Sequence, residues 1–217
     1  MPTAAAQTNA PDALLSEFCT AATAVISDNL ERLPGAVGLR PFHAVAGTMV
    51  GRAFTVKVAA GDNLFIHKAL DLAKPGDVIV VDGGGETSRA LIGEIMVAIA
   101  KSRKLAGFVI DGAIRDSGAI GADEFPVFAR AAIHRGPYKH GPGAIGGAVC
   151  VGGMVVNPGD IVVGDADGVV AFPVAGAAEL LKAVRAHERK EEEMLRQIAE
   201  GTYVGAYSKP DSTGLSA

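Results

Sequence analysis

A strand–helix–strand unit in the middle of the chain constrains the fold more than any other feature. Val78–Val81 and Phe108–Ile110 are uninterrupted apolar runs, typical of strands that are buried on both faces of a sheet. Residues 89–104 between them predict a helix, because apolar side chains recur at helical spacing, at Ile92, Ile95, Met96 and Ile99. This order favours an α/β sheet, and open α/β sheets bind their ligands outside the carboxyl ends of the strands.

The flanking segments predict a single domain around this unit, because no linker divides the chain. Before it we expect a helix from Asp12 to Leu30, an extended segment at 47–58 and a short helix at 64–72. After it we expect a short helix at 117–123, a strand at 126–129, a Gly/Pro loop at 131–147, short strands within 148–172 and a long charged helix at about 177–199. The predicted organisation is therefore a disordered N-terminus at 1–11, one domain at 12–200 and a tail at 201–217.

The amino-acid composition agrees with a sheet covered by helices. Hydrophobic residues make up 49% of the chain, which is enough for a core without disulfides or metals as staples. Trp is absent and aromatics are only 5%, so Val, Ile, Leu and Ala must build that core. The 28 glycines imply many tight turns.

Charge and cysteine content exclude several functional classes. The net charge of -4 and the absence of a Lys/Arg-rich block argue against a nucleic-acid partner. Cys19 and Cys150 lack metal-site spacing, so we expect two buried thiols in a reducing compartment, with one disulfide as the alternative. No basic residue followed by an apolar run opens the chain, and no stretch has the length of a membrane span. We therefore expect a soluble, cytoplasmic protein without a membrane partner.

The segment Asp111-Gly-Ala-Ile-Arg115-Asp116 is the strongest chemical signal. Arginine offers a rigid fork of donors for a carboxylate, and an adjacent aspartate offers a hard oxygen ligand for Mg²⁺ or Mn²⁺. At the end of a strand, the two would let a 2-oxo acid bridge the arginine and a metal ion. Spacing alone favours the simpler alternative, an Arg–Asp pair that neutralises itself on a surface turn.

A glycine-rich turn, GGGETSRALIGE at 83–94, precedes the predicted helix. Free backbone N–H groups and the positive end of a helix dipole favour an anion. Glu94 could hold a metal-bound water there, or it could simply complement the dipole, which is the more common role of an acid at that place.

Three other sequence patterns give weaker indications of function. The run Arg189-Lys190-Glu191-Glu192-Glu193 predicts a solvated helix face, with entry of one glutamate into a neighbouring subunit's cleft as the alternative. Gly141–Gly146 matches GxGxxG, but it contains Pro142 and precedes an extended segment, so it is no dinucleotide site. The five histidines form no HxH or HxxxH pair, so we expect no zinc site and see no clear general base.

Three segments in order, GGGETSRALIGE, GFVIDGAIRD and NPGDIVVGDADGVVAFP, resemble the regulator-of-ribonuclease-activity-A superfamily. This superfamily includes the metal-dependent 4-hydroxy-4-methyl-2-oxoglutarate / 4-carboxy-4-hydroxy-2-oxoadipate aldolases. The similarity runs from about Val25 to Val174. It implies a single-domain α/β fold, a layered α-β-β-α sandwich with N- and C-terminal helical extensions. It also implies a homo-oligomer, a trimer or hexamer, with sites between subunits.

The resemblance also implies roles for individual residues. Arg115 would bind the substrate carboxylate and the enolate oxygen, and Asp116 would ligate a divalent metal, with Mg²⁺ favoured over Mn²⁺ or Co²⁺. The backbone of Gly93, Glu94, Ile95 and Met96 would hold the carboxylate, with Glu94 beside a metal-bound water. The aldolases commonly carry the shorter Asp at this place. A C-terminal glutamate, aligned by spacing with Glu191 and followed by Glu192 and Glu193, would reach the adjacent site.

These roles imply a pyruvate-forming lyase that cleaves a 4-hydroxy-2-oxo acid and decarboxylates oxaloacetate through the same enolate. The long acidic helix after Pro173 resembles the aldolases, because the ribonuclease regulators end soon after that point. A non-catalytic protein that binds a ribonuclease is the alternative. An old label for the family, quinone methyltransferase, finds no nucleoside-binding motif here.

Overall fold

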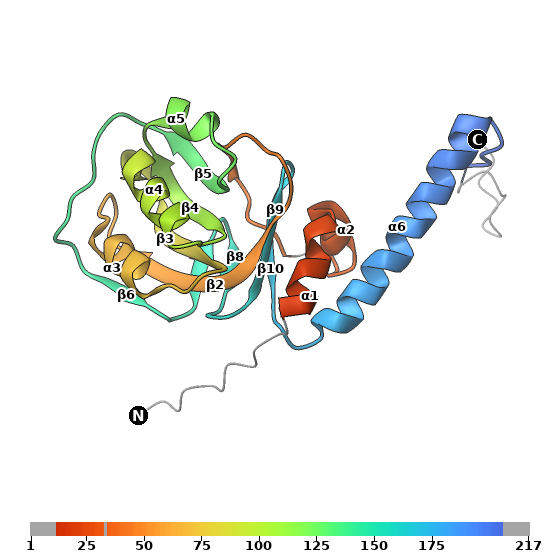
Figure 1. Ribbon diagram of the computed structural model, residues 1–217, viewed down its shortest axis with the longest axis horizontal. Coiled ribbons are helices and arrows are strands. Elements are labelled where there is room, and N and C mark those ends of the chain that lie inside the picture. Colours follow the sequence, from red (N-terminus) through yellow and green to blue (C-terminus); the bar gives the residue numbers. More distant parts are fainter. Residues whose placement is uncertain (1–11, 33, 206–217) are drawn as a thin grey trace, which may run out of the picture.

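A computed structural model describes residues 12–32 and 34–205 as a mixed α/β domain built on one sheet of eight strands (Figure 1). The strand order is β1-β5-β4-β3-β2-β9-β10, and β6 pairs with β2. Strands β2 to β5 are mutually parallel, whereas β1, β6, β9 and β10 pair antiparallel with their neighbours. The strands are β1 (Arg40–Pro41), β2 (Met49–Val58), β3 (Asp77–Ile92), β4 (Gly107–Ile114), β5 (Val127–Ala132), β6 (Gly143–Ile145), β9 (Ile161–Asp165) and β10 (Gly168–Phe172).

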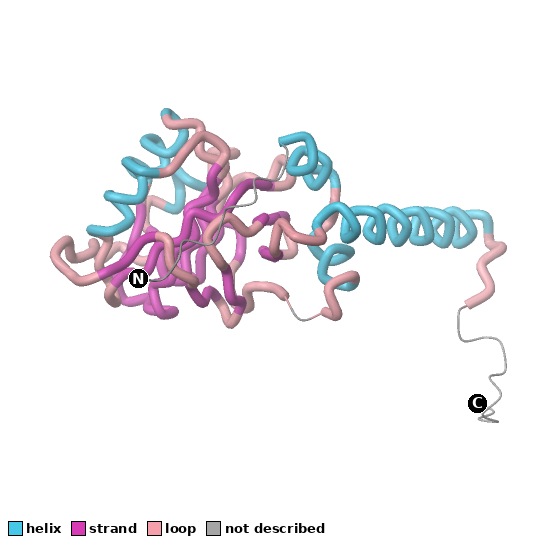
Figure 2. Tube along the Cα trace, turned by 90° about the horizontal axis from the view of Figure 1, so that it is seen from below, coloured by secondary structure: helices cyan, strands magenta, loops and turns pink. Residues whose placement is uncertain are grey.

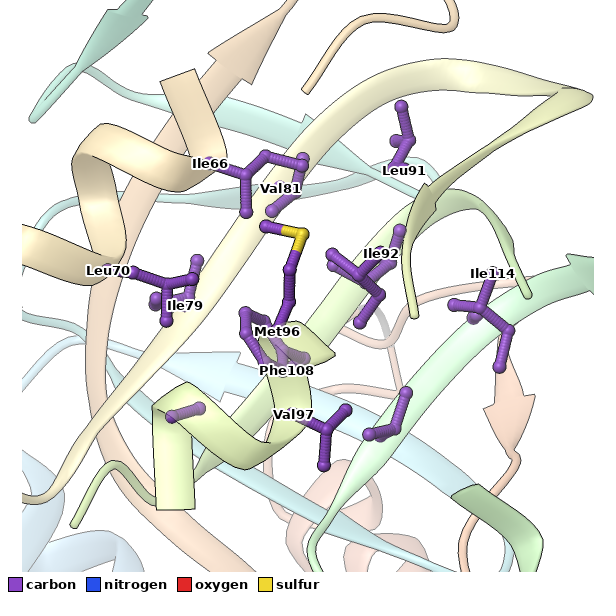
Figure 3. Packing of buried hydrophobic residues seen from close by; sticks show 14 of the residues in the cluster. Ile66, Leu70, Ile79, Val81, Leu91, Ile92, Met96, Val97, Phe108 and Ile114 are labelled. Carbon is purple, nitrogen blue, oxygen red and sulfur yellow. The ribbon is translucent and has the colours of Figure 1, made fainter. Parts of the chain in front are cut away.

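Helices α3 (Leu64–Leu72), α4 (Glu94–Ser102) and α5 (Ser117–Gly121) cover one face of the parallel strands. Alternate strand residues such as Ile79 and Phe108 point to this face and are fully buried. Figure 3 shows Ile66 and Leu70 from α3 and Met96 and Val97 from α4 meeting them in one cluster. The alternation follows from the period of two along a strand, and it divides the core into two layers.

A two-stranded sheet, β7 (Val149–Val151) with β8 (Met154–Val156), covers the other face. It packs on the intervening strand residues, which include Val78, Val80 and Val109. The buried Asp111 carboxylate stabilises the β7–β8 turn, because it accepts a hydrogen bond from the Gly152 N–H at 3.2 Å. The same carboxylate forms an ion pair with Arg130. The layers are therefore helix, large sheet and small sheet.

The terminal helices form a third cluster over β9 and β10. It joins α1 (Asp12–Glu17), η1 (Phe18–Thr20), α2 (Thr23–Asp28) and the start of α6 (Ala177–Glu200). In α6 only Ala177, Leu180 and Val184 are buried. Beyond them the helix runs away from the body of the domain, as both overall views show (Figures 1 and 2). Among the described residues, no helix is long and apolar enough to cross a membrane.

Two predicted helices are wrong in part. The helix expected at 89–104 begins only at Glu94, because Ala90 and Ile92 pair with β4 as the end of β3. The helix expected from Asp12 to Leu30 is broken at Ala21 and Ala22, which are extended. A new helix starts at Thr23, whose backbone N–H and hydroxyl both donate to the Asp165 carboxylate, at 2.8 and 2.7 Å.

Other expectations are confirmed or corrected locally. The helix at 64–72 and the strands within 148–172 are confirmed, whereas the predicted loop at 131–147 contains the end of β5 and all of β6. Because Gly143–Ile145 is extended, the GxGxxG match opens no helix. Cys19 and Cys150 are unpaired as expected, but both are exposed, so their predicted burial is wrong. The predicted N-terminus at 1–11 and the tail after 205 lie outside the described residues.

Candidate active site

The carboxyl ends of β3 and β4 bring the predicted residues of the two strands together. Ile92 pairs with Ile114 at the end of the ladder, where Figure 3 shows them on adjacent strands. The Arg115 N–H donates to the Ile92 carbonyl at 3.0 Å, so Arg115 begins its turn beside the first residue of α4. This contact places the Arg115-Asp116 pair next to the Gly93-Glu94 pair.

Asp116 lies at the centre of this arrangement. Its backbone is left-handed, with φ 57°, a conformation that costs roughly 1–2 kcal/mol for most residues and is tolerated best by Asp and Asn. One carboxylate oxygen, Oδ2, accepts the Glu94 N–H at 3.1 Å and lies 3.7 Å from Arg115 Nε. Within residues 12–32 and 34–205, no donor reaches the other oxygen, Oδ1. The turn therefore presents one free carboxylate oxygen at the N-terminus of α4.

Gly93 is required by space and not by backbone conformation. Its φ of -153° is ordinary extended backbone. A Cβ added there would collide with Asp116 Oδ2 and would lie 3.0 Å from Arg115 Cγ. Glycine at this position lets both functional side chains lie directly against the start of α4.

The N-terminus of α4 keeps one open donor. The Glu94 N–H is used by Asp116, and the Met96 N–H donates to the Gly93 carbonyl at 3.0 Å. The Ile95 N–H has no acceptor among the described residues. Met96 turns its side chain into the core, whereas Ile95 is 71% exposed and Glu94 is exposed. An anion beside Arg115 could thus meet a free N–H and the positive end of the helix.

A segment after β5 forms the other wall of the site. Ile133 N–H donates to the Ile114 carbonyl at 2.8 Å, which brings residues 133–138 alongside the end of β4. A Cβ built on Gly136 would lie 3.3 Å from Arg115 Nη1. Arg89 donates to the Gly136 carbonyl and to the Tyr138 hydroxyl, both at 2.8 Å. The predicted Gly/Pro loop at 131–147 thus contributes to the site, but sequence reasoning singled out none of these three residues, because only long-range folding brings Gly136 to Arg115 and Arg89 to Gly136.

Glu191 is not brought to this site by its own chain. It lies on the part of α6 that leaves the domain (Figure 2), with 48% of its side chain exposed. Its Oε1 lies 3.6 Å from His187 Nε2. Glu192 and Glu193 are also exposed, and Glu193 pairs with Arg196. A role for any of them at Arg115 therefore requires a second chain.

The site offers few protein ligands for a metal. No group of three or more His, Cys, Asp or Glu residues suited to an ion exists in the described part of the chain. Mg²⁺, however, usually keeps several waters and takes only one or two protein carboxylates, together with oxygens of the substrate. The Asp116 side chain, which is 41% exposed and has one free oxygen, fits that mode of binding. A structural zinc site, with its closed set of Cys and His ligands, does not fit the described residues.

Comparison with known proteins identifies the family. A family profile described as "RraA-like: Aldolase/RraA" matches residues 23–171, which include the whole candidate site except Glu191. The chain belongs to the RraA-like family. Within that family, a relative from Halalkalibacterium halodurans named "Putative 4-hydroxy-4-methyl-2-oxoglutarate aldolase" is 39% identical over 187 residues. The alignment covers 86% of this chain and 89% of the relative.

Solved structures share the fold. An uncharacterised protein from Pseudomonas syringae superposes with a TM-score of 0.81 at 28% identity, covering 90% of this chain and 96% of the other. Streptomyces coelicolor RraAS2, titled an unusual member of the RNase ES inhibitor RraA protein family, gives a TM-score of 0.77 at 26% identity. That match covers 85% of this chain and 96% of RraAS2. The mixed α/β fold and the family expected from the sequence are thereby confirmed.

Proposed function

We propose that this RraA-like protein is a divalent-metal-dependent carbon–carbon lyase. Its reaction would be retro-aldol cleavage of 4-hydroxy-4-methyl-2-oxoglutarate or 4-carboxy-4-hydroxy-2-oxoadipate to pyruvate, with oxaloacetate decarboxylation as a second activity. The observation that carries the proposal is the convergence of Arg115, the free oxygen of Asp116 and the open Ile95 N–H at the start of α4. The names of the aldolase relatives support the same class of reaction.

The charges of the site suit a 2-oxo acid that becomes an enolate. The Arg115 guanidinium is a fixed cation whose fork matches a carboxylate and an adjacent oxygen. Because it is held in place before the reaction, it stabilises the developing negative charge without reorganisation. The N-terminus of α4 adds a further positive potential. A Mg²⁺ ion held by Asp116 would supply Lewis-acid polarisation of the 2-oxo group.

The proton transfers fall to glutamates. Retro-aldol cleavage removes the 4-hydroxyl proton as the C3–C4 bond breaks, and the pyruvate enolate that forms takes a proton from water at C3. Glu94 is exposed and its backbone N–H donates to Asp116 Oδ2, so its carboxylate would hold the water that takes the 4-hydroxyl proton. Glu191 would serve a neighbouring copy in a homotrimer or homohexamer, since it lies on α6 beyond Val184, the last buried residue of that helix, where α6 leaves the domain (Figure 1). Oxaloacetate needs no base at its 4-position, so its decarboxylation tests Arg115 and Asp116 alone.

The first test is pyruvate release from oxaloacetate, coupled to lactate dehydrogenase, with Mg²⁺ and with EDTA. We expect metal-dependent release that falls at least about 100-fold in Arg115→Ala and Asp116→Ala, as when a transition-state donor is lost. Asp71→Ala removes a carboxylate from an exposed pair with Arg103 and serves as the matched control. Equal rates in wild type and Asp116→Ala, or release that EDTA does not reduce, would refute the proposal.

The aldol reaction then distinguishes the glutamates. Glu94→Gln and Glu191→Gln should lower cleavage of 4-hydroxy-4-methyl-2-oxoglutarate by roughly 10²–10⁴-fold and spare oxaloacetate decarboxylation, because only cleavage needs the base. Glu192→Gln and Glu193→Gln are controls in the same charged run. If Glu192→Gln or Glu193→Gln lowers the cleavage rate and Glu191→Gln does not, the role proposed for Glu191 belongs to that other glutamate.

The likeness to RraAS2 favours a second candidate, a non-catalytic regulator that binds a ribonuclease. Inhibition of a ribonuclease by the purified protein, at a stoichiometric ratio and unchanged by Asp116→Ala, would support it. Metal-dependent pyruvate release would not be expected of such a protein.

A further inference from the structure

Arg89 makes an unusually complete set of contacts for a residue outside the proposed machinery. Its Nη1 donates to the Gly136 carbonyl and its Nη2 to the Tyr138 hydroxyl, each at 2.8 Å. The guanidinium carbon also lies 3.9 Å from the centre of the Tyr138 ring, a stacked cation–π geometry. Gly61 packs on the aliphatic stem, since a Cβ there would lie 2.9 Å from Arg89 Cδ. The Arg89 side chain therefore contacts the 136–138 segment through two hydrogen bonds and one cation–π interaction.

The backbone around Arg89 holds the same segment. Ala90 N–H donates to the Arg135 carbonyl at 2.9 Å, and Tyr138 N–H donates to the Gly61 carbonyl at 2.8 Å. These bonds fix the two ends of the segment, at 135 and 138. Between the ends, Gly136 is held by Arg89 through its carbonyl. The position of Gly136 therefore depends on Arg89 more directly than that of its neighbours does.

Gly136 in turn limits where the Arg115 guanidinium can lie. The Arg115 side chain is 44% exposed, and its ion-pair partner Asp116 is 3.7 Å away. Its Cγ and Nε pack against Gly93, and its Nη1 lies beside Gly136, where an added Cβ would be 3.3 Å away and tighter than ordinary contact. An exposed arginine keeps most of its rotamer freedom unless its surroundings confine it. Two glycine walls supply that confinement, and Arg89 holds one of them.

We infer that Arg89 is a positioning residue for Arg115, acting through Gly136 and touching no substrate atom. The inference rests on the proposed lyase function and deepens it. Its physical basis is that a displacement of about 1 Å at a reacting group can cost roughly 100-fold in rate, even when the change lies outside the chemistry. Arg89 and Arg115 are 26 positions apart, and Gly136 links their side chains, because Arg89 bonds its carbonyl and Arg115 Nη1 lies beside its Cα.

The variants follow from these contacts. Arg89→Met keeps the apolar stem against Gly61 but removes the hydrogen bonds to Gly136 and Tyr138 and the cation–π contact with the Tyr138 ring. We expect kcat/KM for oxaloacetate to fall about 10- to 100-fold, mostly through kcat, since the lost alignment matters most in the transition state. Arg89→Lys keeps a cation and one donor and should recover part of the loss. Gly136→Ala leaves Arg89 intact and presses directly on Nη1, so it should also lower kcat.

A double-mutant cycle separates positioning from general stability. In an Arg115→Lys background the guanidinium fork is gone, so adding Arg89→Met should cost less than about twofold more. Losses that multiply independently in the double variant would overturn the inference. A fall in melting temperature that accounts for the whole loss, with kcat per folded molecule unchanged, would overturn it too.

A second measurement does not depend on turnover. Phenylglyoxal modification at Arg115, followed by peptide mass spectrometry, reports how freely that guanidinium moves, with exposed Arg40 as the internal reference. We expect faster modification of Arg115 relative to Arg40 in Arg89→Met than in wild type. An unchanged ratio would overturn the inference. If wild type releases no pyruvate but the ratio still rises, the lyase proposal fails and the positioning by Arg89 stands.

Discussion

Gly93→Ala should damage the site while leaving the fold intact. The extended backbone at Gly93, with φ -153° and ψ -171°, accepts alanine without strain. The new methyl group would instead collide with Asp116 Oδ2 and crowd Arg115 Cγ and Nε, at 3.0 and 3.2 Å. The Asp116 carboxylate must move outward by about 1 Å, and the Arg115 side chain by a few tenths of an ångström, to restore ordinary contact distances. They can do so because each is more than 40% exposed.

The magnitude follows from what that movement breaks. The hydrogen bond from the Glu94 N–H to Asp116 Oδ2 is lost or lengthened, and a bond to a charged group is worth about 1.5–3 kcal/mol. At 1.36 kcal/mol for each factor of ten, this corresponds to roughly a 10- to 150-fold loss in kcat/KM. The same lost bond limits the fall in the free energy of unfolding to about 1.5–3 kcal/mol, because the displaced groups enter solvent and not the core.

The assay is metal-dependent pyruvate release from oxaloacetate, beside thermal unfolding of the same sample. Gly118→Ala is the matched control, because Gly118 follows Asp116 closely, lies in helix α5, and has no other described atom within 4 Å of an added Cβ. Alanine there should leave activity unchanged and gain up to about 1 kcal/mol. If Gly93→Ala keeps kcat/KM within twofold of wild type, or if Gly118→Ala loses as much, the reasoning from close packing is refuted.

Two further predictions concern stability. Asp111→Ala should lower the free energy of unfolding in urea by about 3–5 kcal/mol, because it leaves the Arg130 guanidinium and the Gly152 N–H without their buried partner. Asp71→Ala, at the exposed Arg103 pair, should lower it by less than about 1 kcal/mol. Equal losses in the two variants would contradict this account. Burial lowers the pKa of His43 below its ordinary value of 6.5, so below that pH the unfolded chain binds more protons than the folded chain. Stability should therefore fall as the pH drops from 7.5 to 5.5, and His43→Leu should reduce this dependence; a variant with the same pH dependence as wild type would exclude His43 as its source.

Local signals predicted much of the fold. The helix at Leu64–Leu72 and the buried strands at the start of β3 and β4 follow from apolar periodicity and from turns of the Pro-Gly-Asp type. The errors arise where a distant segment decides the local conformation. Residues 90–92 read as helix but join β3, because β4 offers them backbone partners. The first helix breaks at Ala22, because Asp165, 142 positions away, caps a new helix at Thr23.

The residues of the candidate site also divide into those that the sequence could predict and those that only the folded structure shows. Arg115 and Asp116 could be expected at the carboxyl edge of the sheet, because they follow the predicted strand at 108–110. The sequence predicts Glu94 inside a helix at 89–104, and only the pairing of Ala90 and Ile92 with β4 places it at the end of β3. Arg89 could not be expected there, since its partner Gly136 lies 47 positions away in a segment with no local pattern. Gly136 also has no special conformation to mark it; only the nearby Arg115 guanidinium gives it a role.

Because the outer part of helix α6 leaves the domain, its helical structure depends on an equilibrium between the helical and the frayed conformation. Residues 189–200 span about twelve positions, a length at which an isolated helix is marginal in water. The Arg196 pairs with Glu193 and Glu200 add only a few tenths of a kcal/mol each. In a lone chain the amide hydrogens of this stretch should exchange with solvent quickly. If Glu191 completes the site of another copy, the same association must slow that exchange, so amide protection at Leu195 and aldol cleavage should rise together with protein concentration.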